Sequence, residues 1–178
     1  MTACSLLRRN SNCVGFCCSW CLISGPLLIS TDLNSISNES LAILKHEELI
    51  TINQDANGIQ GVRVSPPQPE GAEVWAKQLT VASASGSGGG SSNASSLSVA
   101  VVFLNRASDG KARDISTTWE MLPGFKGVTH AGHQVRVRDI WLRKDLDPVG
   151  GQGYVARNVR AHSVVVLKFT VVRPLPNE

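Results

Sequence analysis

Most of this chain has no cysteine. All five cysteines lie within residues 4–21, and none follows. A small secreted domain that depends on disulfides spreads its cysteines across the fold, so this distribution argues against a disulfide scaffold. The apolar cluster of Cys13, Cys17, Cys18 and Cys21 has no second CxxC pair and no nearby histidine, so we expect no metal site there. Thiols in an apolar segment are more simply explained as packing residues.

Charge of either sign is also scarce. Charged residues make up 17% of the 178 residues, the net charge is only +3, and 42% of the residues are hydrophobic. This composition suits one packed domain, or one domain plus a fragment, and disfavours global disorder. Basic residues are in excess over residues 101–178, but they alternate with apolar ones, as in 135–138, which is typical of the wet face of a strand. No aromatic series accompanies them, so we expect no nucleic-acid partner.

One uncharged apolar run, residues 13–29, could be taken for a membrane signal. Arg8 and Arg9 precede it, as basic residues precede the apolar part of a signal peptide. Gly25-Pro26 and two serines interrupt it, and it is short for a transmembrane helix. A targeting segment and a folded segment both stay open from this pattern, and we expect no membrane association.

Residues 26–52 have the pattern of a strand followed by helical segments. Residues 26–30 form a short apolar run, which is typical of a parallel strand buried on both faces. Ser37 is a good helix N-cap, and the apolar residues after it lie on one helical stripe. Residues 49–52 continue the apolar pattern as a second short element. Asn57-Gly58 then marks a turn.

From residue 62 the apolar residues recur with the period of a strand. We expect strands over residues 73–81, 97–105, 113–119, 134–142, 153–158 and 163–172. Short alternating strands separated by Gly, Pro and Asp turns favour a mainly β fold, an antiparallel β-sandwich. The Ser- and Gly-rich stretch 83–96 cannot form a core, so we expect a flexible loop there.

Two separated motifs of this chain resemble one enzyme family. The first is Ile-Asn-Gln-Asp with the glycines that follow it, residues 52–61, within a longer similar stretch that begins at residue 20. The second is Val-Arg-Asp-Ile-Trp with Lys-Asp-Leu, residues 137–146, followed by residues 162–169. Both resemble the C-terminal third of family 27 glycoside hydrolases, the melibiase group of α-galactosidases and α-N-acetylgalactosaminidases.

The resemblance implies a division of the chain. Residues 19–61 would be the C-terminal end of a (β/α)8 barrel, including its last βα unit, and residues 62–178 a C-terminal β-sandwich. Residues 1–18 lie outside the resemblance, and residues 83–96 look like an insertion. Because a lone barrel strand has no neighbours to complete its hydrogen-bond ladder, we expect residues 1–60 to be poorly anchored while the sandwich folds.

The resemblance also implies a chemistry that this chain does not carry by itself. Enzymes of this family are retaining glycosidases, which need two carboxyl groups about 5 Å apart. In the family both are aspartates on earlier barrel strands, so no catalytic residue is carried over, and no cofactor or metal is implied. The parent enzyme would act on carbohydrates with terminal α-galactosides, and this chain alone is expected to be inactive.

The remaining acids and histidines suggest structural roles. Asp32 follows the expected strand, where barrel enzymes keep their active sites, but one carboxylate cannot run a double displacement, so we expect it to cap a turn. Asp55 is expected to do the same, and His162 to be a turn residue. His130 and His133 lie three residues apart without a third ligand, so we expect no metal there.

Two glycosylation sequons are present, at Asn38 and Asn93. They are possible glycan acceptors if the chain enters the secretory pathway. Members of the family are secreted, lysosomal or vacuolar, yet the sequence has no clear signal peptide, so its localisation stays open.

Other interpretations stay open from the sequence. The sandwich could be a stand-alone carbohydrate-binding or interaction module, with Trp75, Trp119 and Trp141 stacking on sugars, although each is also placed to pack in a core. The chain could also be an incomplete gene product. Preference for galactose or N-acetylgalactosamine, and oligomeric state, are not decided by these residues.

Overall fold

The computed structural model describes residues 18–29, 31–65, 71–80, 97–127 and 134–172. Within them the chain forms a six-stranded sheet and a two-stranded sheet, and every strand pair is antiparallel. The strand order of the large sheet is β1-β2-β3-β8-β5-β6, and β4 pairs with β7. The strands are β1 Val62–Arg63, β2 Ala72–Leu79, β3 Ser98–Asn105, β4 Arg113–Thr118, β5 Gln134–Asp139, β6 Lys144–Val149, β7 Gly153–Val159 and β8 Ser163–Val172.

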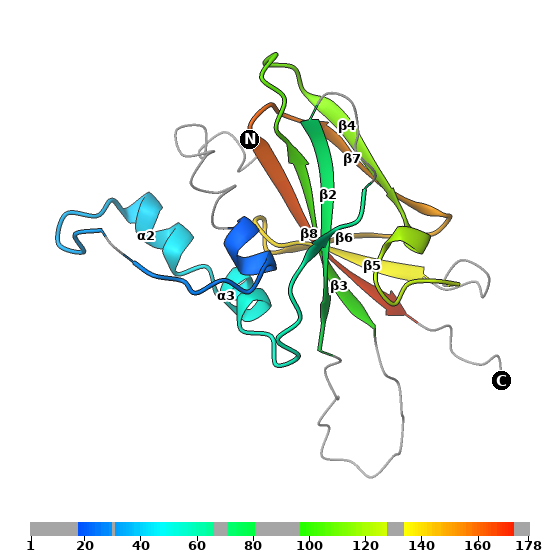
Figure 1. The fold of residues 1–178 in the computed structure, drawn as a ribbon, viewed down its shortest axis with the longest axis horizontal. Coiled ribbons are helices and arrows are strands. Elements are labelled where there is room, and N and C mark those ends of the chain that lie inside the picture. The colour runs from blue at the N-terminus through cyan, green and yellow to red at the C-terminus, as the bar shows by residue number, and fades with distance from the viewer. Residues whose placement is uncertain (1–17, 30, 66–70, 81–96, 128–133, 173–178) are drawn as a thin grey trace, which may run out of the picture.

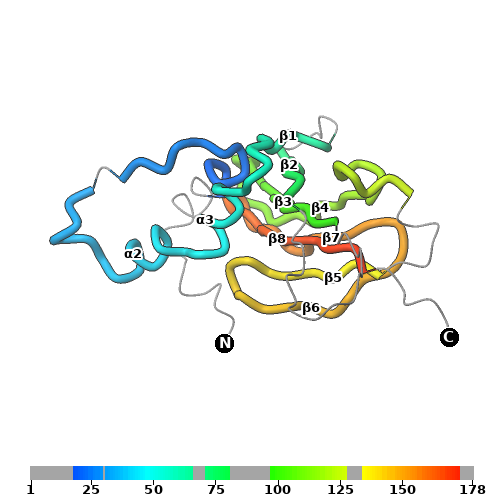
Figure 2. Tube along the Cα trace, turned by 90° about the horizontal axis from the view of Figure 1, so that it is seen from below, coloured from blue at the N-terminus to red at the C-terminus, as the bar shows by residue number. Residues whose placement is uncertain are grey.

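Helices precede the strands. A helical turn spans residues 18–22, and α2 (Asn38–Leu44) and α3 (Glu47–Asn53) follow it. The 3-10 turn η3 (Trp119–Met121) follows β4. Figure 1 shows α3 to one side of the long strands and β4 with β7 to the other, and Figure 2 shows α3 beside the strands while α2 stands farther out.

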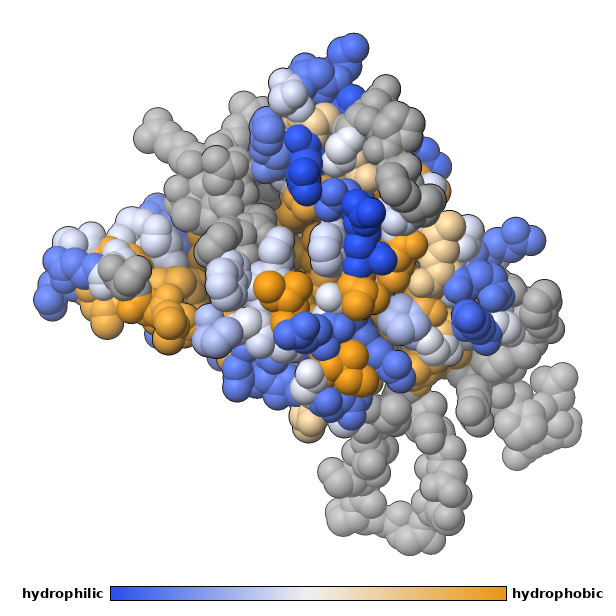
Figure 3. All heavy atoms as spheres, in the orientation of Figure 1, coloured by the Kyte–Doolittle hydropathy of each residue, from blue (hydrophilic) through white to orange (hydrophobic). Residues whose placement is uncertain are grey.

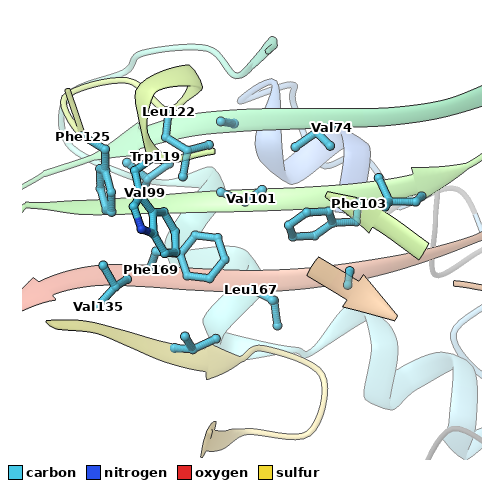
Figure 4. Packing of buried hydrophobic residues seen from close by; sticks show 14 of the residues in the cluster. Val74, Val99, Val101, Phe103, Trp119, Leu122, Phe125, Val135, Leu167 and Phe169 are labelled. Carbon is cyan, nitrogen blue, oxygen red and sulfur yellow. The ribbon is translucent and has the colours of Figure 1, made fainter. Parts of the chain in front are cut away.

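The inner core lies between the two sheets. Alternate residues of β3 and β8 point into it, where they meet Trp119 and Phe125 from the segment after β4 (Figure 4). The ring of Trp119 packs edge to face on Phe169, with 5.3 Å between centroids. Because the side chains of a strand alternate between faces, this set uses every second position of β3: Val99, Val101 and Phe103.

The outer core covers the opposite face of the same large sheet. Ala100 and Val102 of β3 and Val166 of β8 are buried there beneath the turn at residues 18–22 and α3. Strand β3 is thus buried on both faces, which explains why its sequence is a nearly continuous apolar run. We call this side of the large sheet its outer face.

Most expected strands are confirmed within a few residues, but two are missed. Strand β6 contains Asp145, Asp147 and Pro148, a composition that resembles a turn. It lies at the edge of the sheet, where proline and charged side chains are tolerated because one side of the strand needs no ladder partner. Strand β1 is only two residues long, too short to show a period.

The expected strand at residues 26–30 does not form in the part of it that the structure describes. Residues 26–29 have no regular structure, and Leu28 and Ile29 are 88% and 56% exposed. A buried parallel strand needs neighbours on both sides for its backbone groups, and none of the described strands pairs with this segment. The predicted strand is therefore wrong here.

The helical predictions fare better. Ser37 caps α2 by accepting a hydrogen bond from the Ser40 amide at 3.2 Å, as expected. The second short element is α3. Its packing on the outer face corrects the prediction that the whole segment before the sandwich is poorly anchored: residues 26–29 are exposed, but α3 and residues 18–22 are held.

Candidate functional site at the helix–sandwich junction

Several buried polar groups gather where the helices meet the outer face, a region that we call the junction. Lys77 of β2 is fully buried there. Its Nζ donates hydrogen bonds to Ser24 Oγ at 2.6 Å and to the Ile52 carbonyl oxygen. Burial lowers the pKa of Lys77, and the charge of Asp55 opposes that shift. One side chain thereby ties β2 both to the loop after residue 22 and to α3.

Asp55 joins the end of α3 to the end of β2. Its Oδ2 accepts from the Thr80 amide at 2.8 Å, and its Oδ1 accepts from Thr80 Oγ1 at 2.8 Å and from the Asn57 amide at 3.2 Å. The expectation that Asp55 caps a turn is confirmed. The same carboxylate also spans two segments that lie 25 residues apart in the chain.

Asn53 and Gly61 bind residues 18–25 by hydrogen bonds. The Asn53 amide nitrogen Nδ2 donates to the carbonyl oxygens of Trp20 at 3.3 Å and Gly25 at 2.8 Å. The Gly61 amide donates to the Leu22 carbonyl oxygen at 2.9 Å, and a Cβ at position 61 would lie 2.6 Å from Leu22 Cγ. Residues 52–61 therefore hold residues 18–25 against α3 by hydrogen bonds, and they also bond to the end of β2.

Arg138 of β5 forms a second connection between the large sheet and α3. Its Nε and Nη2 each donate to the Glu48 carboxylate of α3 at 2.7 Å, and its Nη1 donates to Asp145 at 3.3 Å. This two-pronged geometry is the strong form of an Arg–carboxylate pair. Hydrogen bonding by Arg138 lowers the pKa of Glu48 and opposes the effect of burial.

The turn after β5 closes the junction. Asp139 accepts a hydrogen bond from the Leu142 amide at 2.9 Å, and burial raises the pKa of this carboxyl. Trp141 lies in the same turn and packs edge to face on the buried ring of His46, with 4.8 Å between centroids. The Val-Arg-Asp-Ile-Trp run therefore builds the other half of the junction.

The comparisons with known proteins agree with this architecture. Residues 69–169, more than half of the chain, match the family model described as the alpha galactosidase C-terminal beta sandwich domain. The chain belongs to this α-galactosidase family. A second model, described as alpha galactosidase A, matches residues 9–55. That match begins inside residues 1–18, which were expected to lie outside the resemblance.

Individual relatives point the same way. The chain is 32% identical over 151 residues to an α-galactosidase from Oryza sativa subsp. japonica, covering 85% of this chain and 30% of that protein. It is 37% identical over 123 residues to α-galactosidase 2 from Arabidopsis thaliana, covering 68% of this chain and 25% of the relative. The chain thus spans less than a third of the length of these α-galactosidases.

Solved structures share the fold. α-Galactosidase I from Mortierella vinacea superposes with a TM-score of 0.70 at 21% identity, covering 89% of this chain and 35% of that one. The α-galactosidase from Saccharomyces cerevisiae solved with raffinose gives 0.69 at 15% identity, covering 91% and 44%. These superpositions show a shared fold, and the family model with the sequence relatives shows that the chain is an α-galactosidase fragment covering the C-terminal sandwich domain.

Asp32 of this α-galactosidase fragment is tied to structural partners. Asp32 lies in an exposed turn, where it accepts hydrogen bonds from the Asn34 amide and from Ser35 Oγ, each at 2.9 Å. These bonds lower the pKa of Asp32 and confirm the turn-capping expectation. Within the described residues, no group of three or more His, Cys, Asp or Glu side chains is arranged to hold a metal ion.

The tryptophans serve packing rather than a shared sugar-binding face. Trp119 lies in the inner core, with its Nε1 donating to the Gly151 carbonyl oxygen at 2.8 Å. Trp75 and Trp141 pack against the outer core on the opposite side of the large sheet, and Trp75 Nε1 donates to Glu73. The idea of a stand-alone sugar-binding module gains no support from this placement or from the family matches.

Other predicted positions are easily placed. Asn38 is exposed at the first residue of α2, and His162 is exposed in a turn with a left-handed φ of 56°. Cys18 and Cys21 are buried in the outer core, as expected of packing residues. Asn93, His130, His133 and the stretch 83–96 lie outside the described residues. Within those residues, no helix has the length and apolar character needed to cross a membrane.

Figure 3 shows apolar side chains gathered over α2 and the loop that precedes it. The exposed apolar side chains of this loop are Leu27, Leu28, Ile29 and Leu33. They belong to the segment that the resemblance assigns to the end of a barrel.

Sequence reasoning missed Lys77, His46 and the Glu48–Arg138 pair. Lys77 alternates with apolar residues in β2, and Arg138 does the same in β5, which is the pattern of a wet strand face. The available signal is that Lys77 shares its face with Trp75, and that Arg138 lies three residues before Trp141, since an aromatic beside a cation favours a covered surface.

Proposed function

We propose that this chain is the C-terminal part of an α-galactosidase-like glycoside hydrolase, in which the sandwich carries and steadies the catalytic barrel. The observation that supports this most is the junction: Lys77, Asp55 and Arg138 fasten the barrel-end segment to the outer face by direct hydrogen bonds. A sandwich that acted alone would not need these hydrogen bonds to the segment that precedes it.

The substrate class follows from the family. The relatives carry the name α-galactosidase, and one solved relative was studied with raffinose. We propose that the whole enzyme releases terminal α-D-galactose from carbohydrates. A retaining mechanism needs two carboxyl groups about 5 Å apart at the sugar, whereas Asp32, Asp55 and Asp139 each serve a turn or a joint. The chain alone is therefore expected not to hydrolyse α-galactosides.

A chimeric enzyme tests this proposal. Residues 19–178 would replace the corresponding C-terminal part of the Oryza sativa enzyme, to which the chain is 32% identical. Hydrolysis of p-nitrophenyl α-D-galactopyranoside is then measured for the chimera and for the present chain alone. We expect activity in the chimera and none above buffer for the chain alone.

A matched variant ties the activity to the junction. Lys77→Ala with Arg138→Ala in the chimera removes the buried cation and the fork to Glu48, so the barrel should lose activity at a lower temperature than in the parent chimera. Lys126→Ala, an exposed lysine, should change nothing. A soluble chimera with a native circular dichroism spectrum but no activity would sink the proposal, and so would hydrolysis by the chain alone.

A further inference from the structure

His46 is an unusual residue at the place where α3 begins. Helix N-caps usually hold Ser, Thr, Asp or Asn, whose side-chain oxygens accept an amide hydrogen bond. Here the imidazole Nδ1 of His46 accepts that bond from the Leu49 amide at 3.4 Å. The residue is only 5% exposed. A histidine can act in this way only while Nδ1 carries no proton.

The far side of the ring is also buried. In the capping tautomer Nε2 carries the proton, and this atom has no hydrogen-bond partner within the described part of the chain. Trp141 Nε1, on the neighbouring ring, has none there either. Neither nitrogen of His46 bonds to a carboxylate among the described residues, and a bonded carboxylate is what would stabilise a second proton on the ring.

The charges around the ring come from the elements packed against it. Arg143, in the turn after β5, disfavours a charged imidazole, while Glu48 of α3 favours it. Glu48 is already held by Arg138 of β5. Backbone groups of His46 and Ile140 also favour the protonated imidazole. Burial is the largest influence and places the pKa of His46 below its ordinary value.

We propose that His46 is an acid-sensitive latch between α3 and the sandwich. While the ring is neutral, its bond to Leu49 and its contact with Trp141 hold the first turn of α3 on the outer face. A second proton goes onto Nδ1, where it points at the Leu49 N–H and abolishes the cap. The new charge also lies beside Arg143, so the first turn of α3 leaves the sheet.

The sign of the pH dependence separates His46 from its neighbours. A histidine whose folded pKa is lowered contributes stability fully above its unfolded value of about 6.5 and loses it as the pH falls toward the folded pKa. Asp139, with a raised pKa, acts in the opposite direction, because its neutral form is favoured in the folded chain. Glu48 has a pKa below 4.5, so it stays ionised at pH 5.5.

Hydrogen exchange of the full chain tests the latch. Protection of the amides in residues 47–53 is measured by mass spectrometry at pH 7.5 and pH 5.5, after correction for the intrinsic pH dependence of exchange. Protection should fall severalfold, and at most about tenfold, because pH 5.5 lies one unit below the unfolded pKa. Peptides from β3 should show no such change.

Two variants separate the latch from a general effect of acid. His46→Asn keeps a neutral oxygen acceptor at the N-cap at both pH values, so α3 should become insensitive to pH. His162→Asn removes an exposed histidine at a φ of 56°, which asparagine tolerates, and should keep the wild-type fall. No fall in the wild-type chain, or an equal fall in His46→Asn, overturns the proposal.

A loss of α3 in His46→Asn at pH 7.5 would require a second variant. His46→Asp supplies a strong N-cap that is ionised at both pH values. An α3 that is protected equally at pH 7.5 and pH 5.5 in this variant supports the latch, whereas a persistent fall overturns it. If α3 is unprotected in both variants, His46 has a purely structural role and the proposal fails.

Discussion

Lys77 shows how a single buried cation is accommodated. Its aliphatic stem lies in the outer core, and its ammonium group bonds to a hydroxyl and a carbonyl oxygen, both neutral acceptors. The described structure shows no carboxylate bonded to this ammonium, and Asp55 acts on it only through space. A buried polar group without a hydrogen bond lowers the stability of the fold. The ammonium group and its two acceptors are therefore stable in the outer core only while they are bonded to each other.

Truncation of Lys77 should therefore destabilise the folded chain. We expect Lys77→Ala to lower the free energy of unfolding by about 2–4 kcal/mol, because it removes buried methylenes and leaves the Ile52 carbonyl unpaired. Lys77→Met keeps most of the volume and should cost less. Urea titrations followed by circular dichroism measure both, with exposed Lys126→Ala as control. A change below about 0.5 kcal/mol for Lys77→Ala would contradict the importance of this bond.

At the scale of elements, α3 depends on its neighbours. It is seven residues long, and a helix of that length is not stable by itself in water. Packing of Leu49 and Ile52 in the outer core and the fork from Arg138 to Glu48 supply what the helix lacks. The helix and β5 are therefore expected to become ordered together.

The Glu48–Arg138 pair gives α3 a second pH dependence, at lower pH than the latch. The pKa of Glu48 is lowered from 4.5, so its contribution to stability is present above that value and is lost as the pH falls through the folded pKa. Glu48→Gln should lower the free energy of unfolding by about 1 kcal/mol at pH 7. At pH 3 the variant and the wild-type chain should differ by less.

Denaturant titrations at the two pH values provide the measurement. Glu39→Gln, which changes an exposed acid of α2, is the control and should have a small effect at both pH values. If Glu48→Gln lowers the free energy of unfolding equally at pH 3 and pH 7, the loss comes from altered packing, and the role assigned to the charge of Glu48 is contradicted.

At the scale of the whole molecule, the large sheet is covered twice. The small sheet covers one face, and α3 with residues 18–22 covers the other. Without the second cover, Ala100, Val102 and Val166 would lie in water as one apolar patch, which is typical of an association surface.

Removal of residues 1–61 should therefore make the sandwich self-associate. Size-exclusion chromatography with light scattering should show a monomer for the full chain and larger species for residues 62–178. Val102→Thr with Val166→Thr in the short chain should restore the monomer, because these residues point outward. The same pair should instead destabilise the full chain. A monomeric short chain without these substitutions would show that the cover is dispensable.

The fold is readable from the sequence wherever burial imposes a simple period. β3 and β8 are predicted well because their apolar residues have no polar interruption of turn type. Strand β6 is missed because Asp147 and Pro148 resemble a turn, and only its place at the sheet edge permits them. The strand expected at residues 26–30 fails because an apolar run cannot reveal whether neighbouring strands exist.

The junction is less readable because its partners are distant along the chain. Lys77 and Ser24 lie 53 residues apart, and Arg138 and Glu48 lie 90 apart. A basic residue between apolar ones predicts a wet strand face, and Arg136 is indeed exposed. Arg138 carries the same local signal but lies partly under α3. No local pattern tells these two arginines apart, since a distant segment decides which is covered.

Strand β8 is the last strand of the described chain, yet it lies between β3 and β5 near the middle of the large sheet. A ribosome makes it after the other strands that the structure describes. Until it leaves the exit tunnel, β3 and β5 each present an open edge with unpaired backbone groups. The emerging chain must therefore hold two unfinished half-sheets in solution, and an interruption of synthesis before residue 163 leaves a product suited to aggregation.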